Sequence, residues 1–439
     1  MLIQIRNTRA LLYEQGEPVV RDADIFIKDD RIDAVCMKGD EYADKPDYVI
    51  DGAHRLAVPG LINSHTHAYM TMFRNIADDV PFTTWLFDTV SPLEDAMTVE
   101  ECYYGTQLAN LEMIRTGTTS YIDMHMTPDV NVRSAMDSGM RVCLTRGLVG
   151  DKKDDEGGLK RLKEALHDEE KYGDNDMVMT MLGPHAPYTC GPGYLEFIAG
   201  YAKEKGYGLH IHLAEGETEI RNLKEQYGLT PIEYADRAGV FDVRTIAAHC
   251  VYLSAQDYDI LSSKHVNVAV NPVSNMKLAN GFSDVPGMLA KNINVCIGTD
   301  GAASNNTLNL FREMAFEAMI HKGLLKDALA VPASEVIKMA TVNGAKALGR
   351  EKDLGRIEKG YKADIILLDL HSPQLAPADN LVSALVYSCS GNEVDTVLVN
   401  GKILMEKKQM KTIDEEKIYF EMDRIGKRYA GIAAAKRSH

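Results

Sequence analysis

Two histidines separated by one residue, His65 and His67, stand in the segment NSHTHAYM directly after an apolar run. In an extended chain, residues i and i+2 point to the same side, so both imidazoles can reach one metal ion. An HxH pair alone is weak evidence for a metal site, because surface histidines are common. The pair therefore predicts a metal centre only if the fold brings further ligands to it.

Further candidate ligands stand where other apolar runs end. His212 and Glu215 follow one such run in HIHLAEGE, His249 ends one in AAHC, and Asp300 ends one in IGTDGAAS. Imidazoles and a carboxylate, with one position left for water, form an open catalytic site for zinc or iron. Glu215 suits a carboxylate that moves protons without binding the metal. The plainer interpretations are a surface glutamate in the charged turn EGETE and a helix-capping role for Asp300.

The apolar runs that precede these residues predict a parallel β/α barrel. They cover residues 58–62, 118–123, 140–145, 177–183, 207–213, 244–249, 266–270 and 293–298. Several are almost continuously apolar, which is typical of strands buried on both faces, and amphipathic helical stretches lie between most of them. Eight strands alternating with helices predict an α/β fold, a (β/α)8 TIM-like barrel of the metal-dependent hydrolase type. A doubly wound open sheet is the main alternative.

In such a barrel, the active site lies at the carboxyl ends of the strands. Four more polar residues end predicted strands there, namely Asp123, His125, Arg146 and His185. A random scatter of 13 histidines would not concentrate so many of them at one rim. Asp123 and His125 are explained equally well as buried polar residues outside the ligand set.

The two ends of the chain have a different texture from the middle. Both alternate apolar and polar residues between turn clusters, and Asn400–Gly401 between two apolar runs is a strong hairpin signal. We expect residues 1–57 and 361–412 to form one small discontinuous β-sandwich domain around a barrel of residues 58–360. Two unrelated β appendages are the alternative. Residues 413–439 should form a C-terminal helix that packs on the outside.

Composition restricts the partners of the protein. The 439 residues carry a formal net charge of −16, which disfavours nucleic acid and anionic membranes as partners, although solubility alone also explains the charge. The seven cysteines are scattered without a CxxC pair, which argues against a disulfide framework and a structural zinc site. The start of the chain lacks a signal-peptide pattern and no apolar run is long enough to span a bilayer, so we expect a cytoplasmic protein.

The segments PGLINSHTH, HLAE, AAHC and GTDGAASNN together resemble the amidohydrolase superfamily. Within it, the chain is most similar to the methylthioadenosine/S-adenosylhomocysteine deaminase group, and the resemblance covers nearly the whole chain. Binuclear relatives carry a carboxylated lysine at the end of the fourth strand, where this chain has GPHAPYT with no lysine. The resemblance therefore implies one divalent metal per subunit, zinc first, with iron, manganese or nickel as alternatives.

The resemblance also assigns roles to individual residues. The metal ligands it implies are His65, His67, His212 and Asp300. The catalytic residues it implies are Glu215 as acid and base, and His249 and Asp300 as the groups that orient the attacking water. The residues it implies for substrate binding are Trp85 on the base, Glu94 on the ribose hydroxyls, and Arg146, Arg161, His185 and Ser304. The family arginine that corresponds to Arg161 follows a GG pair, and in GGLKRLKE the spacing is two residues longer.

The function implied is hydrolytic deamination, at a C–N bond of a cyclic amidine. The adenine of 5′-methylthioadenosine, S-adenosylhomocysteine or adenosine-type nucleosides would become hypoxanthine, with release of ammonia. The alternatives are a deaminase or hydrolase of another heterocycle, such as guanine, a pterin or a chlorotriazine, and a non-catalytic scaffold of the same fold. The expected partner is a small nucleoside; a homo-oligomer is left open, with residues 69–100 as a candidate contact between subunits.

Overall fold

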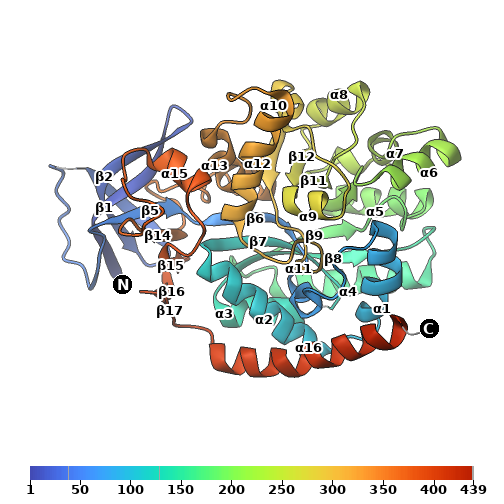
Figure 1. The fold of residues 1–439 in the computed structure, drawn as a ribbon, viewed down its shortest axis with the longest axis horizontal. Coiled ribbons are helices and arrows are strands. Elements are labelled where there is room, and N and C mark those ends of the chain that lie inside the picture. The colour runs from blue at the N-terminus through green and yellow to red at the C-terminus, as the bar shows by residue number, and fades with distance from the viewer. Residues whose placement is uncertain (38, 128, 438–439) are drawn as a thin grey trace.

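The structure, a computed structural model, describes residues 1–37, 39–127 and 129–437 (Figure 1). Its larger part is a barrel in which, among these residues, eight parallel strands follow one another in chain order. The strands are β6 (Leu61–Thr66), β7 (Thr118–His125), β8 (Arg141–Leu148), β9 (Val178–Pro184), β10 (Leu209–Leu213), β11 (Thr245–His249), β12 (Asn267–Val270) and β13 (Asn294–Ile297). Strands β7 and β8 are buried at every position, as parallel strands covered on both faces must be.

Backbone hydrogen bonds join the two ends of this sheet. The amides of Thr299 and Asp300, just after β13, donate to the carbonyl of His65 on β6 at 3.1 and 3.0 Å. The sheet is therefore a nearly closed barrel, which confirms the predicted fold class and excludes the doubly wound open sheet.

Helices cover the outside of the barrel between successive strands (Figure 1). The longer ones are α2 (Val99–Arg115), α3 (Val130–Ser138), α4 (Glu156–Tyr172), α5 (Pro192–Lys205), α6 (Glu217–Tyr227), α8 (Ala255–Ser263) and α12 (Leu310–Leu325). Because each crossover returns the chain to the same end of the barrel, the carboxyl ends of all the strands open at one rim. Among the helices of the described residues, none has the length and apolar character needed to cross a membrane.

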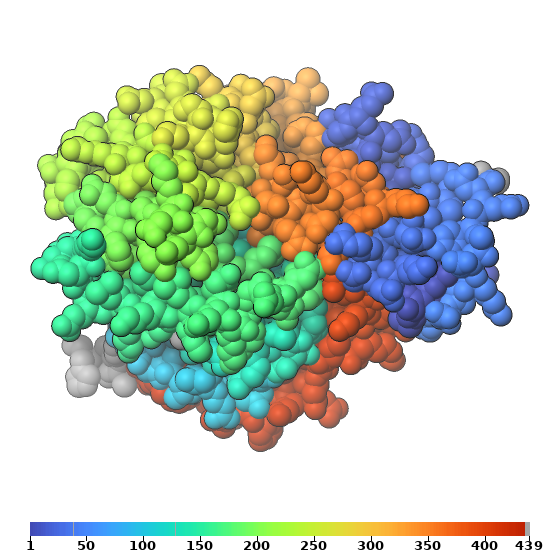
Figure 2. Space-filling model, turned by 180° about the vertical axis from the view of Figure 1, so that it is seen from behind, coloured from blue at the N-terminus to red at the C-terminus, as the bar shows by residue number. Residues whose placement is uncertain are grey.

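The smaller part is a mixed sheet built from both ends of the chain. Within the described residues it has nine strands: β1 (Leu2–Glu14), β2 (Glu17–Lys28), β3 (Arg31–Met37), β4 (Tyr48–Asp51), β5 (Arg55–Pro59), β14 (Ile365–Asp369), β15 (Val394–Val399), β16 (Lys402–Glu406) and β17 (Gln409–Met410). Strand β14 pairs antiparallel with β5, so the N-terminal and C-terminal segments lie side by side (Figure 2). Asn400 and Gly401 form the tight turn between β15 and β16, with φ of +51° and +74°.

A buried ion pair joins this sheet to the barrel. The guanidinium of Arg141, at the start of β8, donates to both carboxylate oxygens of Asp364 at 3.0 and 3.2 Å. The same carboxylate accepts the backbone N–H of Asn400 at 2.7 Å. Arg141 is fully buried, and Asp176 is a second, more distant ion-pair partner at 3.7 Å.

The C-terminal helix α16 (Glu415–Arg437) runs along α2 and the loop after β6 (Figure 1). Arg428 and the hydroxyl of Tyr429 both donate to Glu101, at 2.8 and 3.0 Å. The ring of Tyr429 also meets Phe73 edge to face, with centroids 5.0 Å apart. The helix thereby supports the loop between β6 and α2.

Candidate active site

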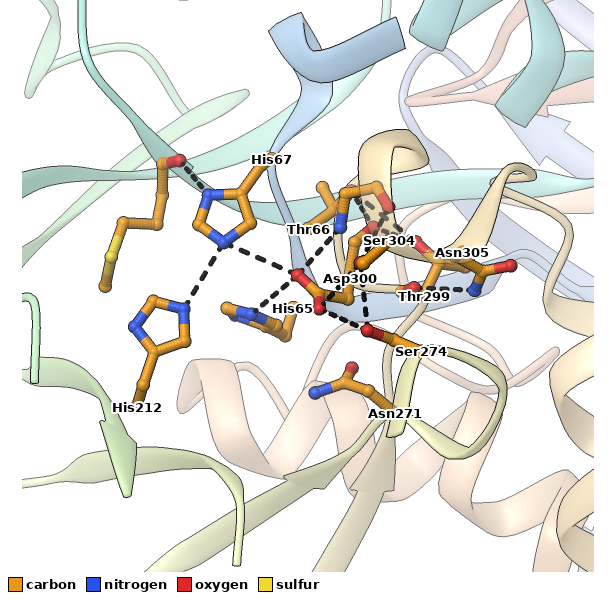
Figure 3. Close-up of polar contacts among 12 residues, drawn as sticks. His65, Thr66, His67, His212, Asn271, Ser274, Thr299, Asp300, Ser304 and Asn305 are labelled. Atoms are coloured by element: carbon orange, nitrogen blue, oxygen red, sulfur yellow. Dashed lines mark hydrogen bonds and ion pairs between the residues drawn. The ribbon is translucent and has the colours of Figure 1, made fainter. Parts of the chain in front are cut away.

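Four histidines and one aspartate meet at the carboxyl end of the barrel. His65 and His67 lie on β6 and just beyond it, His212 lies on β10, His249 ends β11, and Asp300 follows β13. All five are buried. The ring nitrogens Nε2 of His67 and His212 are 3.3 Å apart, and Nε2 of both His65 and His67 lies 3.5 Å from Oδ1 of Asp300 (Figure 3). The structure thus brings together the residues that the strand ends predicted.

This cluster fits a divalent metal ion. Two groups of residues place their potential ligand atoms close together, so that within each group these atoms lie within 4.8 Å of one another. One group is His65, His212 and His249, and the other is His65, His67 and Asp300. Nε2 of His65 is buried and has no hydrogen-bond partner in the described part of the chain, which is unfavourable unless another group binds there. Burial lowers the pKa of His65 to about 4, although Asp300 acts to raise it, so the ring is neutral and offers a lone pair. Neutral imidazoles with one carboxylate are a donor set typical of zinc.

The orientation of the rings supports the same conclusion. Nδ1 of His67 lies 2.7 Å from the carbonyl of Met124, and Nδ1 of His212 lies 2.7 Å from the carbonyl of His185. A carbonyl can only accept, so each Nδ1 carries the hydrogen and each Nε2 is left with its lone pair toward the cluster. Partners of this kind orient the histidine ligands of known metal sites.

Asp300 is held by its own set of donors. The hydroxyls of Ser274 and Ser304 donate to Oδ2 at 2.6 and 3.0 Å, and the amide of Gly301 donates to Oδ1 at 2.7 Å. Burial acts to raise the pKa of Asp300, but the neighbouring imidazoles of His65, His249 and His67 together outweigh it and hold the pKa below its usual range. The backbone of Asp300 has a φ of +60°, a strained conformation of the kind that clusters at functional sites. Ser304, predicted to bind substrate, is fully buried and contacts Asp300.

Glu215 lies beside the cluster without joining either group of ligand atoms. Its Oε1 is 3.9 Å from Nε2 of His249 and accepts the side-chain amide of Asn280 at 3.2 Å. Burial raises the pKa of Glu215, so its acid form persists to a higher pH than usual. The carboxylate of Glu219 accepts the amides of Ala214 and Glu215 at 3.2 and 2.9 Å and so fixes the turn that carries Glu215.

A cavity of about 420 Å³ opens onto the cluster. Trp85, Glu94 and His185 line it, as does Glu215. The indole N–H of Trp85 donates to the carbonyl of Ala303 at 3.2 Å, which fixes the ring in the wall. The cavity is therefore open to a ligand that reaches both an aromatic face and the imidazole cluster.

Within the described residues, Glu94 has one hydrogen-bond donor in this wall. Its Oε1 accepts the hydroxyl of Tyr69 at 2.5 Å. Burial raises the pKa of Glu94 to about 7, with the Tyr69 hydrogen bond acting to lower it. The carboxylate can thus ionise near neutral pH and accept further hydrogen bonds from a ligand.

The two predicted arginines have different surroundings. Arg146 is buried and donates to Glu164 and to the carbonyl of Gly147, both at 3.0 Å. Arg161 lines a neighbouring cavity of about 560 Å³, which shares Tyr188 with the first one. Neither guanidinium is among the groups that line the first cavity in the described part of the chain.

Several residues of the site were not predicted from the sequence. His210 lies on β10 and contacts His65, and its spacing from His212 in HIH equals that of His65 from His67, which could have identified it. Tyr69 lies in the short helix η1 (Ala68–Phe73), where strand alternation no longer applies. Asn275, whose Oδ1 lies 2.8 Å from Nδ1 of His249, lies on the short helix α9 (Pro272–Lys277) after β12. Asn280 lies in the loop that follows this helix, and neither residue carries a pattern that marks it.

Comparison with known proteins identifies the family. The model of the Amidohydrolase family matches residues 56–404. The 5-methylthioadenosine/S-adenosylhomocysteine deaminases of Caldanaerobacter subterraneus subsp. tengcongensis and Thermoanaerobacter pseudethanolicus are 44% and 43% identical, and each match covers 97% of this chain and 98% and 99% of the relative.

Solved structures agree with this assignment. An adenosine deaminase from Xanthomonas campestris with bound zinc is 29% identical, with a TM-score of 0.92 and 98% of both chains covered. Atrazine chlorohydrolase from Arthrobacter aurescens TC1, complexed with zinc, is 25% identical, with a TM-score of 0.88 over 97% of this chain and 100% of that one. The protein belongs to the amidohydrolase family.

Proposed function

We propose that this protein is a metal-dependent hydrolytic deaminase of adenosine-type nucleosides. It would convert the adenine of 5′-methylthioadenosine, S-adenosylhomocysteine or adenosine to hypoxanthine and release ammonia. The observation that carries the proposal is the single cavity in which Trp85 and Glu94 face the imidazole cluster and Glu215. The names of the curated relatives support the same substrate class.

The metal would be one divalent ion, with zinc as the first candidate, held by His65, His67, His212 and Asp300. Both groups of potential ligand atoms among the described residues include His65, which favours one ion over two. When bound, such an ion supplies Lewis acidity and lowers the pKa of a water molecule to about 7. The zinc in two similar solved structures supports this choice of metal.

The protein's own residues would then move the protons. Glu215, in its acid form, donates a proton to N1 of the purine, which makes C6 more electrophilic. The attacking water forms a bond to C6 while His249 and Asp300 accept hydrogen bonds from it and orient it. The water gives one of its protons to the Glu215 carboxylate, which restores the acid form, and its other proton passes to the amino group. The C6–N bond then breaks, C6 keeps the water oxygen as its carbonyl, and ammonia leaves. The proximity of Glu215 and His249, 3.9 Å apart, supports a shared role at one water.

The substrate would be held along the cavity wall. Trp85 packs on the base, Glu94 accepts hydrogen bonds from the ribose hydroxyls, and His185 flanks the nucleoside. Arg146, which donates to Glu164 and the Gly147 carbonyl, would act from behind the cavity wall. Arg161 would meet only a 5′ substituent that extends into the neighbouring cavity. Ser304 would act through Asp300, to which it donates. The free cysteines support a reducing, cytoplasmic location.

A screen of ammonia release tests this proposal. The zinc-loaded protein is assayed with adenosine, 5′-methylthioadenosine, S-adenosylhomocysteine, guanine and cytosine at equal concentrations. We expect the adenosine analogues to react fastest and Glu94→Ala to slow them. A rate on guanine above that of every adenosine analogue would refute the substrate class.

A hydrolase of another heterocycle is the second candidate. It is favoured by the likeness to an atrazine chlorohydrolase with a TM-score of 0.88. Such a substrate has no vicinal hydroxyls, so it would leave Glu94 without a ligand. Unchanged activity of the Glu94→Ala variant on the best substrate would support this candidate over the nucleoside deaminase.

A further inference from the structure

The ring of His65 is oriented differently from the other three histidines of the cluster. Those three place Nδ1 against an oxygen atom: a backbone carbonyl for His67 and His212, and the side-chain carbonyl of Asn275 for His249. Nδ1 of His65 instead lies 2.9 Å from Nε2 of His210, an atom that can either donate or accept. The immediate partner of His65 therefore does not decide which of its nitrogens carries the hydrogen.

The next contact along the chain of hydrogen bonds does decide it. Nδ1 of His210 lies 3.0 Å from Oγ1 of Thr145, and the same hydroxyl lies 3.0 Å from the backbone carbonyl of Asp123. A carbonyl only accepts, so Thr145 gives its one hydrogen to Asp123 and offers a lone pair to His210. Nδ1 of His210 must then carry the hydrogen of that ring. Nε2 of His210 accepts from Nδ1 of His65, and Nε2 of His65 keeps its lone pair.

We propose that the Thr145 hydroxyl, acting through His210, selects the tautomer of His65 that can bind the metal. Thr145 on β8, His210 on β10 and His65 on β6 are each fully buried, so the orienting contact comes from the protein. The opposite arrangement would keep the bond between the two imidazoles and move the hydrogen of His65 onto Nε2. At the other end of the chain of hydrogen bonds, Nε2 of His65 lies 3.5 Å from Oδ1 of Asp300 and makes no hydrogen bond within the described residues. The Thr145 contact therefore distinguishes the two arrangements, which makes Thr145 and His210 positioning residues.

This inference rests on the metal-binding part of the proposed function and not on the substrate. Thr145→Val removes the hydroxyl and keeps the shape of the side chain, whereas Thr145→Ser keeps the hydroxyl. Dialysed, metal-free proteins are titrated with zinc in competition with a chromophoric chelator. We expect Thr145→Val to bind zinc about 10–100-fold more weakly, the range seen when outer partners of ligands are removed, and Thr145→Ser to bind as the wild type does.

Nitrogen NMR of the metal-free proteins gives a readout that packing alone would not change. The His65 ring should show hydrogen on Nδ1 in the wild type and in Thr145→Ser, and on Nε2 in a substantial population of Thr145→Val. Equal zinc affinity for wild type and Thr145→Val, or an equal loss in the valine and serine variants, would overturn the inference.

A second pair of variants covers the case in which Thr145→Val does not fold. His210→Gln retains an acceptor for His65 and a donor for Thr145, and His210→Leu retains neither. We expect the glutamine variant to keep most of the zinc affinity and the leucine variant to lose it, and equal affinities would contradict the inference. If the wild type itself binds no zinc, the proposed metal centre is wrong. If the wild type and the variants bind zinc equally, the metal centre stands and only the role given to Thr145 and His210 is wrong.

Discussion

Replacement of Tyr69 by phenylalanine tests how the cavity recognises the ribose. The change removes the hydroxyl that donates to Glu94 at 2.5 Å and keeps the buried ring. Without this donor, Glu94 loses its fixed rotamer, and its pKa rises above the present value of about 7 because the Tyr69 hydrogen bond acts to lower it. Fewer molecules then present an ionised, correctly placed carboxylate to the substrate.

The size of the effect follows from the hydrogen bond that is lost. A hydrogen bond to a charged group contributes about 1.5–3 kcal/mol. Because Glu94 is only partly ionised near neutral pH, we take the lower part of that range. At about 1.4 kcal/mol for each factor of ten, kcat/KM for adenosine should fall about 10–30-fold, mainly through KM.

Steady-state ammonia release with paired substrates measures this loss. Adenosine and 2′,3′-dideoxyadenosine differ only in the hydroxyls that Glu94 would bind, so Tyr69→Phe should slow the first far more than the second. Tyr234→Phe is the matched control, because it removes a buried hydroxyl that donates to the Cys190 carbonyl instead. Equal losses for both substrates would refute the assignment of Glu94 to the ribose.

Three other changes test separate parts of the molecule. Glu215→Gln should lower kcat about 10²–10⁴-fold while elemental analysis still finds the wild-type zinc content, because the residue moves protons and does not bind the ion; loss of zinc from this variant would contradict that role. Arg141→Ala should lower the free energy of unfolding in urea by about 3–5 kcal/mol, because it leaves the buried Asp364 without its charged partner, whereas a change near zero would mean that the ion pair does not stabilise the fold. Finally, KM for adenosine should fall as the pH rises through about 7, since burial raises the pKa of Glu94 to that value and its ionised form is the better acceptor. If a Glu94→Gln variant keeps the same pH profile, the pH dependence of KM belongs to another group.

The core of the site could be predicted because it depends on regular structure. The i, i+2 spacing of His65 and His67 and the positions of His212, His249 and Asp300 at strand ends need only strand alternation and a closed barrel. The barrel itself follows from buried apolar strands alternating with helices, and both ends of the chain meet in one sheet because β5 and β14 pair.

Residues outside regular strands could not be predicted in the same way. Tyr69 lies in a short helix after β6, and the direction of its side chain depends on the packing of α16 and Phe73 nearby. Arg161 lies on α4 and faces the neighbouring cavity, because its direction is set by the helix rather than by a strand end. His210 is the exception: strand alternation applied to HIH would have placed it beside His65.

A zinc titration of metal-free protein, with ammonia release from adenosine or 5′-methylthioadenosine as the readout, tests the central claim most directly. If His65, His67, His212 and Asp300 hold one catalytic ion, activity should rise from background and reach its plateau at about one zinc per chain. Full activity without metal, or a plateau only at about two ions per chain, would contradict the single-metal deaminase.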